Sequence, residues 1–139
     1  MARNLLLRHE ERATVSGPVE EPRRVLVVED DQASRKALVT LLSRLGHVVE
    51  GADCAKKALQ KLENRPDFVV LDLILPDGLG IAVLQRIRMQ RLPSRVVILT
   101  GVEDPQNISE ITDYEPDAIF TKPLDLDALI EWMRATSPL

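Results

Sequence analysis

The regular alternation of two kinds of segment constrains the fold more than any other feature of this sequence. Short segments that are apolar throughout alternate with segments whose apolar residues recur at the helical spacing of i, i+3 and i+4. A segment that is apolar throughout, rather than at every second residue, is typical of a strand in a parallel sheet covered on both faces. Five segments fit this description, the second being the weakest and expected at an edge: residues 24–28, 47–52, 68–72, 95–100 and 118–121.

The segments that follow these strands carry apolar stripes and are expected to be helices. The first helix is predicted to end where Gly46 supplies a left-handed residue, and the fourth to begin with Asp104 as N-cap and Pro105 at its first position. The order of elements is (βα)5, which predicts an α/β fold with a doubly wound parallel five-stranded sheet and helices on both faces. The stripes are Leu38, Leu41, Leu42 and Leu45; Ala55, Ala58, Leu59 and Leu62; Val83, Leu84 and Ile87; Ile108 and Ile111; and Leu126, Leu129, Ile130 and Met133.

The composition indicates one compact domain preceded by an arm. The chain has 139 residues, of which 45% are hydrophobic, and this is enough for a single core. We place the domain at residues 23–136. Residues 1–22 mix charges of both signs with Ser, Gly and Pro and are interpreted as a flexible N-terminal arm. Within the arm, residues 2–13 are either a short docking helix or a frayed terminus.

Charge and cysteine content argue against several classes of function. A net charge of −4 argues against direct binding of nucleic acid or of an anionic membrane, since both partners require a basic face. The single cysteine, Cys54, excludes an internal disulfide and a site of several thiolates, and it fits a reducing compartment. The longest apolar run near the start, residues 5–7, is too short for a signal peptide or a membrane span, so a cytoplasmic location is expected.

Polar and charged residues follow the predicted strands at the point where each strand ends. In a parallel sheet these ends meet at one edge, where ligands bind near the switch in strand order. Each residue alone has an ordinary explanation, and Asp31 is better explained as the N-cap of the first helix than as a ligand. Their joint occurrence at one edge indicates a site. The residues are Glu29, Asp30 and Asp31 after the first strand, Asp72 on the third, Thr100 and Gly101 on the fourth, and Thr121, Lys122 and Pro123 on the fifth.

The clustered carboxylates indicate metal-assisted chemistry. Like charges held together persist either by raising a pKa or by sharing a hard divalent cation, and Mg²⁺ suits such a site because it takes oxygen ligands and keeps positions for water and phosphate. Asp72 lies between the acidic pair and Lys122, which makes it a candidate nucleophile toward phosphorus. Mg²⁺ on one side and Lys122 on the other would neutralise the oxygens of a transferred phosphoryl group.

Four motifs together resemble one known family, the receiver domains of bacterial two-component response regulators. The motifs are LVVEDDQASR, VLDLILPDGLG, VVILTG and FTKP, and the resemblance covers residues 24–135. It implies the flavodoxin-like strand order 2-1-3-4-5. It also implies a phosphorylation-dependent signalling receiver that is not an enzyme in the usual sense, since it catalyses only its own aspartyl phosphorylation and dephosphorylation.

The resemblance assigns a metal site and an acceptor. Glu29 and Asp30 match the family's acidic pair, with Asp30 as the more direct ligand of Mg²⁺. Asp72 matches the phosphoacceptor and is also a metal ligand. The backbone carbonyl of Ile74 would be the third ligand from the protein.

The resemblance also assigns residues that read the phosphoryl group. The hydroxyl of Thr100 would contact it and Lys122 would pair with one of its oxygens, while the bond between Lys122 and Pro123 is expected to be cis. Gly101 is either an opening for water or a partner, or simply a turn glycine. The family usually has Tyr or Phe where this chain has Ile119, so the aromatic part of the switch is in question.

Three further apolar residues bear on the expected switch and on the lifetime of the phosphorylated state. Phe120 is next to Ile119 but should point to the opposite face of the sheet, because strand residues alternate. Ile74 and Val102 each lie two residues beyond a site residue and are apolar. We therefore expect them to shield the phosphoryl group from water and to give a long-lived phosphorylated state.

The resemblance implies protein partners. The phosphodonor would be a sensor histidine kinase or a histidine phosphotransfer protein, and phosphorylation would switch binding of a downstream protein, with homodimer formation as an alternative. Because no effector domain follows the last predicted helix, the chain is expected to act as a stand-alone receiver resembling the chemotaxis regulator; the alternative is that it is one segment of a longer protein. Trp132 on that helix is either an interface anchor or the rim of the core.

Three rival functions remain open at this stage. A Mg²⁺-dependent phosphatase working through an aspartyl-phosphate needs an acid two residues after the nucleophile, where this chain has Ile74. A nucleotide- or flavin-binding module needs a glycine-rich loop after the first strand, where the chain reads EDDQAS. A degenerate receiver that acts as a phosphorylation-independent interaction scaffold would keep the fold without the switch.

Overall fold

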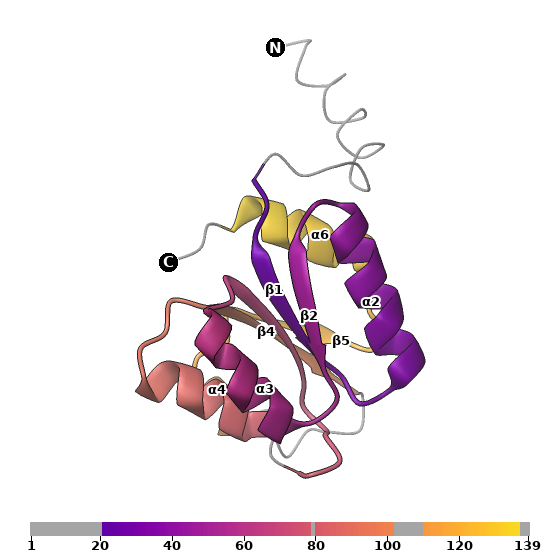
Figure 1. The fold of residues 1–139 in the computed structure, drawn as a ribbon. Helices are drawn as coiled ribbons and strands as arrows, with labels where there is room; N and C mark the ends of the chain where they lie inside the picture. The colour runs from indigo at the N-terminus through magenta and orange to yellow at the C-terminus, as the bar shows by residue number, and fades with distance from the viewer. Residues whose placement is uncertain (1–20, 79, 102–109, 137–139) are drawn as a thin grey trace.

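The sheet of this protein has the topology that the sequence predicts. A computed structural model describes residues 21–78, 80–101 and 110–136 (Figure 1). In this part of the chain five strands form one parallel sheet in the order β2-β1-β3-β4-β5, which confirms the predicted order and places β2 at an edge. The strands are β1 (Arg24–Val28), β2 (Val48–Ala52), β3 (Phe68–Asp72), β4 (Arg95–Thr100) and β5 (Ala118–Thr121).

The described helices lie where the apolar stripes predict them. Asp31 is the N-cap of the first of them and accepts a hydrogen bond from the Ser34 N–H at 2.8 Å, as expected. Gly46, just past its end, has a φ of 106°, which confirms the predicted left-handed residue. The helices are α2 (Gln32–Arg44), α3 (Ala55–Lys61) with the 3₁₀ turn η1 (Leu62–Asn64), α4 (Gly80–Met89) and α6 (Leu126–Ala135).

Three predictions concern residues outside the described parts of the chain. They are the arm up to residue 20 with its short helix, the start of the fourth helix at Asp104 and Pro105 together with Ile108 of its apolar stripe, and the shielding position Val102. Residues 110–112, which are described, are helical, and Ile111 on this turn is buried as predicted.

Each face of the sheet has its own apolar core. Side chains of β1, β3 and β4 alternate between the faces, so α3 and α4 pack on one face and α2 and α6 on the other (Figure 1). Phe120 packs in the second core, opposite to Ile119, as strand alternation predicts. Trp132 is half-buried against the same core, and its ring meets that of Phe68 edge to face, with the ring centroids 5.7 Å apart. This fits its interpretation as the rim of the core.

The N-terminal edge of the sheet is held by a carboxylate that is fully bonded. Asp117, just before β5, accepts from the Val96 N–H at 2.7 Å and from the guanidinium groups of Arg95 and Arg88 at 3.0 and 3.1 Å. Burial alone would raise the pKa of Asp117, but these hydrogen bonds outweigh it and hold the pKa below its usual value. Asp117 therefore joins β4, β5 and α4 in its charged form.

The open side of β2 is covered by side chains from the end of α3. The carbonyl of Ala52 faces β1, where it accepts from the Glu29 N–H, so the carbonyl of Gly51 points to the open side. This Gly51 carbonyl accepts from Lys61 Nζ at 2.9 Å, and Asn64 Nδ2 donates to both carboxylate oxygens of Glu50 at 3.0 and 3.1 Å. The Gly51 carbonyl and the Glu50 carboxylate at this edge thus have partners from the chain itself.

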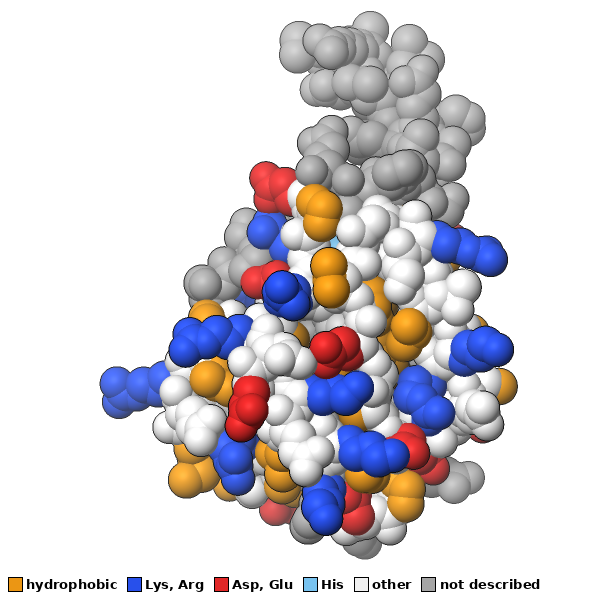
Figure 2. Space-filling model, viewed as in Figure 1, with side chains coloured by type: hydrophobic (Ala, Val, Ile, Leu, Met, Phe, Trp, Pro, Cys, Tyr) orange, Lys and Arg blue, Asp and Glu red, His pale blue; other side chains and the backbone are white. Residues whose placement is uncertain are grey.

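Positive side chains are scattered over the face that carries α2, β2 and α3. Figure 2 shows Lys and Arg side chains over these elements, with Asp and Glu between them.

Among the described residues, no helix is long and apolar enough to cross a membrane.

Candidate functional site

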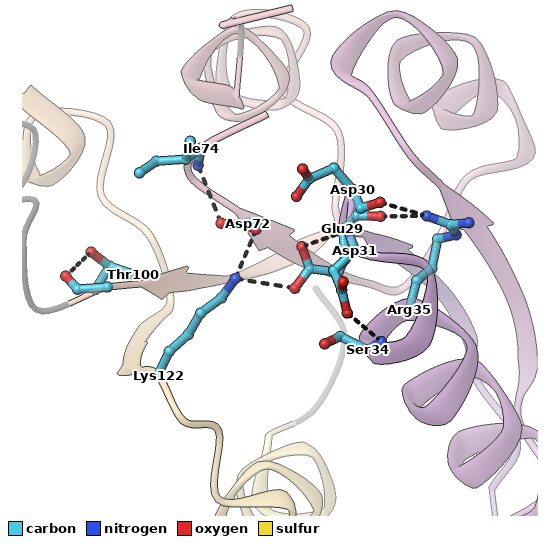
Figure 3. A network of polar contacts seen from close by, with 10 residues as sticks. Glu29, Asp30, Asp31, Ser34, Arg35, Asp72, Ile74, Thr100 and Lys122 are labelled. Atoms are coloured by element: carbon cyan, nitrogen blue, oxygen red, sulfur yellow. Dashed lines mark hydrogen bonds and ion pairs between the residues drawn. The ribbon is translucent and has the colours of Figure 1, made fainter. Parts of the chain in front are cut away.

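Three charged side chains from three strands meet at the C-terminal edge of the sheet (Figure 3). Glu29 follows β1, Asp72 ends β3 and Lys122 follows β5. Lys122 Nζ lies 2.8 Å from Asp72 Oδ2 and 3.1 Å from Glu29 Oε1. Both acids are buried, with 5% of Asp72 and 6% of Glu29 exposed, whereas the lysine is partly open to solvent. The sheet therefore brings together the residues that the sequence predicts at this edge.

The acids of this edge form a cluster suited to a hard metal ion. Carboxylate oxygens of Glu29, Asp30 and Asp72 all lie within 4.8 Å of one another, and Asp30 is exposed. Lys122 pairs with two of these three carboxylates, those of Glu29 and Asp72, so the negative charge of the cluster exceeds the single positive charge of the lysine. Hard oxygen donors with excess negative charge and one solvent-facing member are the donor set that Mg²⁺ prefers, so these residues fit that ion.

The pKa values of Glu29 and Lys122 are both shifted from their usual values. Burial, together with the hydrogen bond and charge of Asp72, raises the pKa of Glu29 to about 7, although Lys122 partly opposes this. Burial by itself lowers the pKa of Lys122, but hydrogen bonds to Asp72 and Glu29 outweigh it and leave the pKa above its usual value. The lysine is therefore charged, while Glu29 changes its protonation state near neutral pH.

The turn after β1 is held by a residue that the sequence reasoning did not single out. Arg35 of α2 donates from Nη1 to the main-chain carbonyls of Glu29 and Asp30 at 2.9 and 3.2 Å. The Asp31 N–H lies 3.4 Å from Glu29 Oε2, at the long end for a hydrogen bond. Arg35 is part of the LVVEDDQASR motif, and its position on the first turn of the helix that follows the acids was the available signal.

The loop after β3 returns to the acceptor position. The N–H of Ile74 donates to Asp72 Oδ1 at 3.2 Å, so both carboxylate oxygens of Asp72 have partners. The side chain of Ile74 is 58% exposed. An ideal Cβ on Gly80 would lie 2.2 Å from the carbonyl oxygen of Leu73, which explains why the chain has glycine where α4 begins.

Thr100 ends β4 beside this cluster. Its side chain is buried, and its hydroxyl donates to the carbonyl of Gly101 at 3.1 Å. The N–H of Lys122 donates to the Thr100 carbonyl at 2.8 Å, and the bond between Lys122 and Pro123 is cis. Figure 3 shows the Thr100 side chain apart from the bonded group of Lys122, Asp72 and Glu29.

Position 119 differs from the expected switch in its surroundings as well as in its identity. Ile119 is paired with Ile98 in the sheet and is 38% exposed. An exposed aliphatic side chain takes the place of the aromatic ring that the resemblance leads one to expect there.

The fold and the site together define a class of protein. A doubly wound five-stranded parallel sheet carries an acidic cluster at the C-terminal ends of its strands. A lysine that follows β5 forms an ion pair with this cluster. Residues 25–134 match the family model described as the response regulator receiver domain. The chain therefore belongs to the response regulator receiver domain family.

Curated relatives agree with this assignment. The transcriptional regulatory protein PhoP of Escherichia coli K12 is 34% identical over 113 residues, which cover 81% of this chain and 51% of the relative. The virulence transcriptional regulatory protein PhoP of Salmonella typhimurium is 35% identical over the same span, covering 50% of that protein. The chain thus spans about half the length of the curated relatives it matches.

Solved structures share the fold. The receiver domain of the Francisella response regulator 1452 superposes with a TM-score of 0.73 at 29% identity, covering 81% of this chain and 94% of that one. The CheY-like receiver domain protein of Methanospirillum hungatei gives a TM-score of 0.72 at 28% identity, covering 83% and 93%. The similarity extends over nearly the whole of both domains.

Proposed function

We propose that this chain is a phosphorylation-dependent signalling receiver in which Asp72 accepts a phosphoryl group, with Mg²⁺ bound by the acidic cluster. One observation carries the proposal: Lys122 Nζ bridges Asp72 and Glu29 at the sheet edge where the family places its acceptor. The phosphodonor is a sensor histidine kinase or a histidine phosphotransfer protein in the cytoplasm, and the output is altered binding of a downstream protein or of a second copy.

The reaction requires little covalent chemistry from the protein. An oxygen of the Asp72 carboxylate attacks phosphorus, the new O–P bond forms, and the N–P bond to the donor histidine breaks with its electron pair remaining on the imidazole nitrogen, which takes up a proton. Lys122 lies 2.8 Å from Asp72 Oδ2 and so is placed to stabilise an oxygen of the incoming group. Mg²⁺, when bound, supplies charge neutralisation to the phosphoryl oxygens.

The metal would be held by side chains of Glu29, Asp30 and Asp72 and by the main chain at Ile74. Glu29 must lose its proton to bind the metal. Arg35 holds the acidic turn in place by donating to the main-chain carbonyls of Glu29 and Asp30. Thr100, whose hydroxyl bonds only to the adjacent carbonyl among the contacts described above, is free to turn toward a phosphoryl group. Ile74, with its exposed side chain, would shield that group and lengthen its lifetime.

One observation favours a second candidate function. Ile119 replaces the usual switch aromatic, so phosphorylation would lack one of the family's means of changing the surface beyond β5. A degenerate receiver acting as a phosphorylation-independent scaffold is therefore the alternative.

The test is a mass measurement. The protein is incubated with Mg²⁺ and acetyl phosphate, and the intact mass of the wild type is compared with that of Asp72→Asn. One phosphoryl adduct on the wild type alone is expected. An unmodified wild type would favour the scaffold, and an adduct on Asp72→Asn as well would contradict the assignment of the acceptor.

A further inference from the structure

Helix α3 begins without a side-chain cap from its own N-cap residue. Cys54 makes no side-chain hydrogen bond to the helix, although the first N–H groups of a helix have no partner within it. Those of Ala55 and Lys56 donate instead to Asp77, to Oδ1 and Oδ2 respectively, at 3.2 Å each. A carboxylate from another segment of the chain therefore caps this helix.

Asp77 belongs to the loop that follows Asp72. Within this loop the side chains of Leu73 and Leu75 are buried in the core that also contains residues of α3, while Ile74 between them is exposed. The Ile74 N–H is bonded to Asp72. The loop thus has its main chain at the site, Leu73 and Leu75 in the core, and Asp77 on the N-terminus of α3.

The other side of the loop is held by close backbone packing. The start of α4 lies so near the carbonyls of Leu73 and Asp72 that a Cβ on Gly80 would be 2.2 Å and 3.1 Å from their oxygens. The backbone at the start of α4 therefore packs closely against the first part of the loop. Movement away from the site on the α3 side is opposed by the two hydrogen bonds of Asp77.

We propose that Asp77 is a positioning residue for the metal site. By bonding the loop to the first turn of α3, it fixes the main chain at Ile74, whose carbonyl is the proposed third protein ligand of Mg²⁺. This inference rests on the proposed function. It also has a reciprocal consequence, because a metal that orders the loop must tighten the cap on α3 by the same coupling.

The experiment measures Mg²⁺ binding by titration calorimetry in the unphosphorylated protein, together with amide hydrogen exchange at Ala55 and Lys56. Asp77→Ala is expected to bind Mg²⁺ about tenfold more weakly than the wild type, as is typical when a residue that orients a metal ligand is lost. In the wild type Mg²⁺ should slow exchange of the two amides, whereas in Asp77→Ala they should exchange fast with or without the ion. Asp77→Asn, which keeps one acceptor oxygen, should lie between the two.

Asp67→Ala is the matched control. Asp67 also accepts from a main-chain N–H of a distant segment, that of Arg24 at 2.9 Å, but at the opposite edge of the sheet. Its loss should lower the stability while leaving Mg²⁺ affinity within about twofold. Wild-type affinity in both Asp77 variants, with faster exchange at the two amides, would make Asp77 a helix cap only and overturn the inference. A wild type that binds no Mg²⁺ would overturn the proposed function and this inference with it.

Discussion

Charged groups gather both at the N-terminal ends and at the C-terminal ends of the strands, but the pKa of an acid is lowered at the first edge and raised at the second. At the N-terminal edge one carboxylate, Asp117, is matched by two guanidinium groups and a main-chain N–H, and its pKa is lowered. At the C-terminal edge Glu29 and Asp72 share Lys122 within a cluster of three carboxylates, and burial together with Asp72 raises the pKa of Glu29 to about 7. A fully compensated acid is part of the framework, whereas an acidic cluster with excess negative charge is suited to the cation that we propose for it.

The largest effect should come from breaking the compensated edge. Asp117→Ala removes the carboxylate that binds the Val96 N–H and the partly buried guanidinium groups of Arg88 and Arg95, so we expect a loss of about 3 kcal/mol in the free energy of unfolding. Urea denaturation followed by circular dichroism measures this. Asp113→Ala, at an exposed position four residues before Asp117, is the control and should change stability by less than about 0.5 kcal/mol. A loss below about 1 kcal/mol for Asp117→Ala would contradict the comparison.

Breaking the acidic edge should affect binding instead of stability. Asp30→Asn removes an exposed carboxylate from the cluster, so Mg²⁺ affinity should fall on the order of 30-fold while the free energy of unfolding stays within about 0.5 kcal/mol. Calorimetry with Mg²⁺ and urea denaturation test the two halves. Asp53→Asn, after β2 at the same edge but outside the cluster, should leave the affinity unchanged. Equal losses of affinity in both variants would mean that only net charge matters.

The pH dependence should have opposite signs at the two edges. Because the folded-state pKa of Glu29 is raised from 4.5 to about 7, its contribution to the stability of the metal-free protein is complete below the unfolded value and is lost as pH rises through about 7. The contribution of Asp117, whose pKa is lowered, is present above its unfolded value and is lost as pH falls through the folded value.

Magnesium binding should follow the same proton. Below pH 7 the ion must displace the proton of Glu29, so the affinity should rise by up to about tenfold per pH unit and level off above it. Calorimetric titrations between pH 5.5 and 8 measure this slope. Glu29→Gln should bind more weakly and should lose most of the slope; a slope that survives in this variant would assign the proton to another group.

The smallest effect on metal binding should come from the shared lysine. Lys122→Ala removes a cation rather than a ligand, so Mg²⁺ affinity should stay within about fivefold of the wild type. What should change is the response to phosphorylation, measured by amide exchange around Thr100 after treatment with acetyl phosphate. Lys57→Ala, an exposed lysine paired with Asp53, is the control. A normal response in Lys122→Ala would refute its assigned role.

The predictable part of this protein is the part set by short-range patterns. Continuous apolar runs identify the strands, helical spacing identifies the stripes, and the common direction of parallel strands brings Glu29, Asp72 and Lys122 to one edge. These features repeat within a few residues, so the sequence alone displays them.

Apart from the local bonds of Arg35, the unpredicted contacts described above join segments far apart along the chain. Asp77 caps a helix that begins 22 residues earlier, and Asp117 bonds Arg95 and Arg88, 22 and 29 residues away. Such bonds use single side chains and leave no periodic trace. The sequence allows a raised pKa within the acidic cluster but does not assign it to Glu29, because the shift depends mainly on how deeply the folded sheet buries that carboxylate.

The covered edge of β2 has a consequence for the protein at high concentration. An exposed strand edge is a template on which another chain can add a strand, and lysine side chains are a common means of preventing this. Here an incoming strand would have to displace the Lys61 ammonium from the Gly51 carbonyl before it could pair. The chain thus carries a built-in barrier to edge-to-edge aggregation on this side, and Lys61→Ala should aggregate faster than the wild type in light-scattering measurements.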